Sequence, residues 1–180
     1  MDSNARIRSV DLSGLRVIKY PDPRLRQTCI PVDAVDASVR ALVERMWELM
    51  LTGRGVGLAA PQVGLTVRLF VASPAFSTDD LRVYINPEII DARKTFEADE
   101  GCLSFPGIHC NIKRSRIVTV RALGLHGQQF EETVEDLAAR IVQHEIDHLD
   151  GRLLVDRMST VARLANRRAL KELEEQFQAA

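Results

Sequence analysis

The sequence is short of cysteine and of aromatic residues, and it has no long apolar run. Its 180 residues include three cysteines, and aromatic residues make up 5%. An odd and sparse set of cysteines is a poor disulfide framework, so we expect a reducing compartment in which a thiol stays free. No run of about 18 apolar residues is present, and we therefore expect no membrane-spanning helix.

An excess of charge of one sign is also lacking. The chain has 24 basic and 25 acidic residues, and its formal net charge is -1. No global field draws such a protein to DNA or to an anionic membrane, so neither is expected as a partner. Residues 1–15 lack the apolar stretch of a signal peptide, and their acidic residues argue against a transit peptide. Together these features predict a cytoplasmic protein.

The order of predicted elements favours an α+β fold. A helix is predicted after Asp33 or Asp36, strands over 67–72 and 81–85, an irregular stretch over 88–110, and a hairpin of 117–123 with 128–134. Helices follow over 135–149 and 160–177, and the last has an apolar stripe of Val161, Leu164, Ala169, Leu173 and Phe177. We expect small antiparallel or mixed β-sheets around a central helix, with a C-terminal helix.

The central helix carries the strongest chemical pattern, His144-Glu145-Ile146-Asp147-His148. Residues four apart lie on one face of a helix, so both imidazoles can bind one divalent ion. Glu145 lies beside the ion without having to ligate it, which suits a base that takes a proton from water. The neighbouring residues are apolar, and buried imidazoles need polar partners that a metal would supply. The pattern therefore predicts a metal site.

A catalytic metal commonly has three protein ligands and one open position, and the sequence offers two kinds of third ligand. Cys102 follows a glycine that lets the backbone bend sharply. The alternative is a glutamate of the last helix, as in a zincin-like protease, and the candidates are Glu172, Glu174 and Glu175. We favour a solvated helix face for the glutamates, and we assign Cys29 and Cys110 to structure.

Three segments together resemble the peptide deformylase family. Gly55-Val56-Gly57-Leu58-Ala59-Ala60-Pro61-Gln62 resembles its first motif, Glu100-Gly101-Cys102-Leu103-Ser104 its second, and Gln143-His144-Glu145-Ile146-Asp147-His148 its third. Their order and spacing also fit, and the similarity extends from about Tyr20 to Gly151. The family removes the formyl group from the N-terminal formyl-methionine of newly made proteins, so formylated nascent polypeptides are the expected partner.

The resemblance implies a role for each matching residue. Cys102, His144 and His148 ligate the metal, and Glu145 handles protons. The Gln62 amide and the Leu103 N–H bind the developing oxyanion, and such a donor is typically worth about 3–4 kcal/mol. Fe2+ is the expected native metal, and the Cys/His/His set is also compatible with Zn2+, Ni2+ or Co2+.

Substrate contacts are expected around the same site. The resemblance implies that backbone groups of Val56 and Gly57 pair with an extended substrate. Leu137 and Ile141 precede the ligands on the same helix face, so they are candidates for the wall of a methionine pocket. His109 stands where many members of the family have an arginine, and it can contact the peptide only as a charged or neutral donor.

The chain is expected to be one domain in three parts. Residues 1–16 form a flexible lead-in, residues 17–157 the metal-dependent catalytic domain, and residues 158–180 a C-terminal helix of the same domain. The helix has a basic set of side chains that favours a solvated face or, as in related bacterial enzymes, a ribosome-docking surface. The set is Arg163, Arg167, Arg168 and Lys171.

Two other functions are compatible with parts of the pattern. A zincin-like endopeptidase would use a glutamate as third ligand. A non-enzymatic module would need a closed site with a fourth protein ligand, for which the candidates are Cys110, His109 and His126. Glu145 and the Gln62 loop argue against the module, because a structural site needs neither.

Overall fold

The computed structural model describes residues 2–179. The helices are α1 (Ser3–Arg8), α2 (Ala37–Thr52), α3 (Asp136–Leu149), α4 (Leu154–Arg157), α5 (Thr160–Ala165) and α6 (Arg167–Gln178). The strands are β1 (Gly57–Ala59), β2 (Leu69–Ala72), β3 (Arg82–Cys102), β4 (Phe105–Leu123) and β5 (Gln129–Glu135). No helix within this part of the chain is long and apolar enough to cross a membrane.

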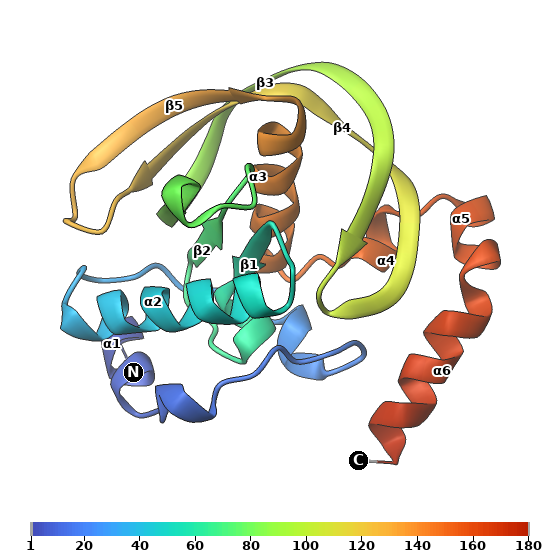
Figure 1. The fold of residues 1–180 in the computed structure, drawn as a ribbon, viewed down its shortest axis with the longest axis horizontal. Helices are drawn as coiled ribbons and strands as arrows, with labels where there is room; N and C mark the ends of the chain where they lie inside the picture. The colour runs from blue at the N-terminus through green and yellow to red at the C-terminus, as the bar shows by residue number, and fades with distance from the viewer. Residues whose placement is uncertain (1, 180) are drawn as a thin grey trace.

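The five strands form one antiparallel sheet in the order β1-β2-β3-β4-β5. Figure 1 shows the long strands β3 and β4 curving over α3, with β5 beside β4. The β4–β5 pairing confirms the predicted hairpin, in which Ile117 lies opposite Glu135 and Leu123 opposite Gln129. The α+β class with a single domain around a central helix is therefore confirmed.

The expected irregular stretch over 88–110 is wrong, because most of it belongs to β3 and β4. Strand pairing continues from Glu88 opposite Arg121 to Gly101 opposite His109. Asn86-Pro87 falls at a shift of register, where a proline costs no ladder hydrogen bond. Asn86 has a positive φ and exchanges two hydrogen bonds with the Val32 backbone, which anchors the shift. Residues 91–95 are all exposed, so this part shows no alternation of apolar residues.

Helix α2 begins and packs as its sequence predicts. The Asp36 carboxylate accepts hydrogen bonds from the N–H groups of Ser38 and Val39, which satisfies two orphan donors of the first turn. The predicted apolar stripe is fully buried in a core shared with β1 and β2, and consists of Val39, Leu42, Val43, Met46 and Met50.

Both ends of the chain differ from the expected elements. The segment expected to be a flexible lead-in contains α1, whose Ile7 is buried and whose Ser3 bonds to Asp33. The predicted last helix is two helices, because Asn166 leaves the helical conformation between α5 and α6. The expected apolar stripe is partly right, since Leu173 is buried whereas Val161, Leu164 and Phe177 are exposed. Leu170, which the stripe did not include, is also buried, and both leucines pack beside Ile112 of β4.

Candidate metal centre

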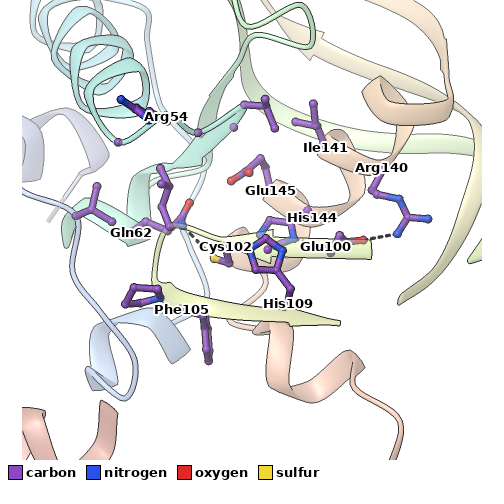
Figure 2. A pocket seen from close by; sticks show the side chains of 18 of the residues that line it. Arg54, Gln62, Glu100, Cys102, Phe105, His109, Arg140, Ile141, His144 and Glu145 are labelled. Atoms are coloured by element: carbon purple, nitrogen blue, oxygen red, sulfur yellow. Dashed lines mark hydrogen bonds and ion pairs between the residues drawn. The ribbon is translucent and has the colours of Figure 1, made fainter. Parts of the chain in front are cut away.

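Three candidate ligands converge on one point, as the sequence predicts. One ligand atom from each of Cys102, His144 and His148 lies within 4.8 Å of the others. Figure 2 shows Cys102 and His144 side by side among the residues that line a pocket. Both histidines are buried and Cys102 is half-buried, so the group is held away from bulk solvent. This geometry suits a single metal ion.

Secondary structure brings the three side chains together. His144 and His148 lie one turn apart on α3, with ring centroids 5.0 Å apart in an edge-to-face arrangement. Cys102 ends β3, and a two-residue turn returns the chain to β4 at Phe105. Strand β4 packs on α3, so this turn places the thiol beside the helix.

Glu100 fixes the orientation of His144. Its Oε1 atom lies 2.9 Å from His144 Nδ1, and both side chains are buried. Burial raises the pKa of Glu100, but hydrogen bonds from His144 and Arg114 outweigh it and lower the pKa to about 2. An ionised carboxylate only accepts, so Nδ1 of His144 carries the proton and Nε2 is the free ligand atom.

Two buried arginines complete the network behind the metal site. Arg114 donates two hydrogen bonds to Glu100 at 2.7 and 2.9 Å and one to Asp147 at 2.8 Å. Arg140 donates to Glu100 at 2.6 Å and lies over the Phe96 ring. These contacts tie β3 and β4 to α3, and they balance the buried carboxylates. No sequence pattern predicted a role for Glu100, Arg114 or Arg140.

The second histidine supports the fit of a metal ion. His148 Nε2 lies 3.3 Å from Cys102 Sγ, while Nδ1 is buried and has no partner among residues 2–179. Burial lowers the pKa of His148 well below its usual range, so the imidazole is neutral and keeps a lone pair. A thiol and two imidazoles form a donor set for Fe2+, Co2+, Ni2+ or Zn2+. The residues therefore fit a metal ion.

Glu145 lies on the pocket side of α3, next to the first ligand. It is 3% exposed, and its Oε2 atom has no hydrogen-bond partner among residues 2–179. Burial raises the pKa of Glu145 to about 7. A side chain on Gly57 would collide with the Glu145 carboxylate, so only glycine lets β1 approach this closely. A buried carboxyl that titrates near neutral pH is suited to proton transfer.

The Gln62 amide is held in one orientation. Its Oε1 atom accepts a hydrogen bond from the Ala59 N–H at 2.8 Å. The Nε2 group therefore faces Cys102 Sγ, at 3.5 Å, and the Ser104 hydroxyl, at 3.2 Å. Ser104 is fully buried, and its role was not predicted from the sequence. The arrangement points an amide donor at the candidate metal site.

A pocket of about 550 Å³ opens above these residues. Its walls are residues 53–57 on one side and parts of β3 and β4 on the other, with α3 as the floor. Among the predicted substrate contacts, Val56, Gly57, Leu137, Ile141 and His109 all line it. Ile141 is buried, whereas Leu137 is 50% exposed and belongs to the rim.

Strand β1 lies at the edge of the sheet formed by residues 2–179. Strand β1 is the first in the sheet order, so it has a partner on one side only. The Val56 carbonyl accepts a hydrogen bond from the Ser73 N–H at 2.9 Å, so this carbonyl already has a partner within the protein. A bound peptide would extend the sheet from the remaining edge.

The alternative ligands lie elsewhere. Among residues 2–179, the group that can hold a metal has three members, and it includes neither Cys110 nor His109 nor His126. The candidate glutamates each have another partner, which is Arg168 for Glu172, Tyr20 for Glu174 and Lys171 for Glu175. Cys29 and Cys110 are buried free thiols. A site with three protein ligands matches a catalytic metal better than a structural one.

Comparisons with known proteins identify the family of this chain. The family model described as polypeptide deformylase matches residues 15–164. A peptide deformylase of Acidobacterium capsulatum is 44% identical over 160 residues, which cover 88% of this chain and 94% of the relative. A peptide deformylase of Pseudomonas aeruginosa is 42% identical over 163 residues, covering 90% of this chain and 95% of the relative.

Solved structures extend the agreement to three dimensions. The peptide deformylase of Plasmodium falciparum superposes with a TM-score of 0.89 at 34% identity, covering 92% of this chain and 98% of its own. The peptide deformylase of Legionella pneumophila superposes with a TM-score of 0.85 at 41% identity, with the same two coverages of 92% and 98%. The chain therefore belongs to the polypeptide deformylase family, the metal-dependent hydrolases that remove the N-formyl group from newly synthesised polypeptides.

Proposed function

We propose that Cys102, His144 and His148 hold one divalent metal ion, and that Glu145, Gln62 and Leu103 carry out the deformylation of formyl-methionine beside it. The main support for this proposal is that the three ligand atoms lie within 4.8 Å of one another. When bound, the metal supplies Lewis acidity, which activates water near neutral pH and polarises a carbonyl group.

Glu145 moves the proton. The carboxylate takes a proton from the attacking water and then gives it to the departing amine, so that formate and a free N-terminus result. A pKa of about 7 allows both directions of transfer near neutral pH. Burial keeps bulk water from exchanging this proton during the reaction.

Gln62 and the Leu103 N–H stabilise the negative charge that develops on the formyl oxygen. The Ala59 bond fixes the amide so that its N–H donors face the site before substrate arrives. Leu103 follows Cys102 in the turn between β3 and β4, which places its backbone beside the ligand. Donors that are already oriented cost no reorganisation during the reaction.

The methionine side chain occupies the apolar part of the pocket. Ile141 and Val56 line its wall, and Leu137 covers its rim. The peptide backbone pairs with Gly57 at the edge of β1 and with the N–H of Val56, whose carbonyl is already bonded by Ser73. His109 lies across the pocket beside Asp99, with Nδ1 and Oδ2 3.1 Å apart, and contacts the peptide from that side.

Fe2+ is the proposed native metal, with Zn2+, Ni2+ and Co2+ as substitutes. The soft thiolate and two borderline imidazoles accept all four ions. The test is the metal content and formate release of Cys102→Ala beside the parent. Loss of bound metal together with activity supports Cys102 as a ligand. Retention of full metal content would contradict Cys102 as a ligand.

The proposed partners are formylated nascent chains and, through α5 and α6, the ribosome, in the cytoplasm. Arg163, Arg167, Arg168 and Lys171 are all exposed on these helices. Truncation is a poor test because Leu170 and Leu173 pack into the core. Arg163→Glu with Arg167→Glu should abolish ribosome co-sedimentation, and the parent's binding should fall steeply with salt. Unchanged co-sedimentation would exclude this surface.

A further inference from the structure

Arg54 is a cation of the pocket mouth that has no acidic partner. It lines the pocket and is exposed, and it takes part in none of the ion pairs formed among residues 2–179. The other basic side chains around the mouth are already engaged. Their partners are the Leu103 carbonyl for Lys19, Glu100 for Arg140 and Asp99 for His109.

The backbone at Arg54 is one that favours glycine. Its φ of 56° is left-handed, and it follows the last turn of α2, where a glycine is the usual residue. The Arg54 N–H bonds to the Leu51 carbonyl at 3.0 Å and the Gly55 N–H to the Met50 carbonyl at 2.9 Å, which closes the helix. An arginine is thus held in a strained position at the edge of the binding pocket.

The position matches the downstream part of a bound peptide. Arg54 is three residues from Gly57, which lies against Glu145, so it is at most about 10 Å along the wall from the reacting centre. An extended peptide covers the same distance in about three residues. Figure 2 shows Arg54 and His109 on different sides of the central Gln62 and Cys102 side chains. Successive peptide side chains alternate in direction, so one of the second and third residues faces Arg54.

We propose that Arg54 selects nascent chains with an acidic residue at the second or third position, counting formyl-methionine as the first. A guanidinium without a partner attracts a carboxylate and repels an ammonium group. Asp99 lies on the other wall, where its carboxylate is hydrogen-bonded with His109. The inference rests on the proposed deformylase function and adds a substrate class to it.

The test compares formyl-Met-X-Ala-amide and formyl-Met-Ala-X-amide, where X is Glu, Gln or Lys. Amidated ends remove the terminal carboxylate, which would otherwise bind Arg54 itself. With iron-loaded parent protein at low salt, we expect the Glu peptide to exceed the Lys peptide in kcat/KM by about three- to tenfold at one position, the scale of one exposed ion pair gained and one repulsion avoided. The difference should lie in KM and shrink in 0.5 M salt.

Variants assign the preference to this side chain. Arg54→Ala should bring the Glu/Lys ratio to about one, Arg54→Glu should invert it, and Arg54→Lys should retain it. Arg40→Glu makes the same charge change 14 residues earlier on α2, about 21 Å away, and should leave the ratio as in the parent.

Two failures have different meanings. If the parent releases no formate from either Gln peptide, the proposed function fails before the inference is reached. If the Gln peptides are deformylated but Glu and Lys peptides react equally at both positions, or if the ratio survives Arg54→Ala, the charge selection by Arg54 is wrong.

Discussion

Glu100 is the residue on which the orientation of the metal site depends. It accepts from His144, Arg114 and Arg140 in a buried position. Glu100→Gln replaces a carboxylate, which only accepts hydrogen bonds, with an amide that also donates. It also removes the negative charge that faces the buried Arg114 and Arg140. We expect a loss of about 3 kcal/mol in unfolding free energy at pH 7 and a 10- to 100-fold loss of metal affinity. Urea unfolding and metal titration measure both effects.

The matched control for that change is Glu97→Gln, which alters an exposed glutamate of the same strand. It should leave unfolding free energy and metal affinity close to those of the parent. Equal effects of the two substitutions would show that the buried network does not orient the site.

The contribution of Glu100 should also depend on pH. Its pKa is lowered to about 2 from 4.5, so its stabilisation is complete above pH 4.5 and is lost as the pH falls toward 2. The gap in unfolding free energy between the parent and Glu100→Gln should therefore narrow from pH 5 to pH 2. Urea unfolding with a chelator at every pH measures this without a contribution from metal loss. A difference in unfolding free energy as large at pH 2 as at pH 6 would contradict the lowered pKa of Glu100.

At the residue scale, the sequence predicted the three candidate metal ligands that converge at the site and missed the residues behind them. The spacing of His144 and His148 on a helix, and the glycine before Cys102, carry direct chemical meaning. Arg114 reaches Glu100 and Asp147 only because β3, β4 and α3 pack together, and no local pattern shows this. Ser104 is the last residue of the second deformylase motif, but its hydrogen bond with Gln62 joins positions 42 residues apart, which no local pattern shows.

At the scale of elements, Arg54 follows α2 in a strained backbone conformation. The gain in stability on removing this strain can be measured. Glycine adopts the left-handed conformation of Arg54 without steric cost but loses more freedom on folding. Arg54→Gly should therefore raise the unfolding free energy by about 0.5–1 kcal/mol. Arg54→Ala removes the same charge and retains the strained conformation, so it should bring no such gain. Chemical denaturation measures these free energies. Equal unfolding free energies of Arg54→Gly and Arg54→Ala would show that the backbone at position 54 is not strained.

Helices were predicted correctly where a periodic stripe of apolar residues is buried in the core. Helix α2 and helix α3 were predicted within a few residues because one face of each is buried. The long β3–β4 ribbon was missed because residues 91–95 are exposed on both faces. The break between α5 and α6 at Asn166 has no glycine or proline to mark it, and beyond it α6 buries Leu170 beside the predicted Leu173.

At the scale of the whole molecule, α6 stabilises the domain. Leu170 and Leu173 are each 7% exposed, and Tyr20 bonds to Glu174. Ending the chain after Ser159 should cost about 3 kcal/mol or more, since a buried leucine contributes about 1.5–3 kcal/mol. For a domain of this size the melting temperature should fall by roughly 6–12 °C. Thermal unfolding measures the change.

A shorter truncation is the control for that result. Ending the chain after Glu175 keeps both buried leucines and Glu174, although it removes the exposed Phe177. Its melting temperature should stay close to that of the parent. If both truncations melt like the parent, the packing of α6 contributes nothing to stability.

The most direct test of the central claim is formate release from formyl-Met-Ala-Ser by the iron-loaded protein, prepared without oxygen, beside Glu145→Ala. We predict rapid release by the parent and a loss of about 10²–10⁴-fold in the variant, the usual contribution of general acid–base catalysis. Metal analysis must show that the variant retains its ion. No release by a folded, fully metallated parent, or undiminished release by metal-loaded Glu145→Ala, would contradict the account.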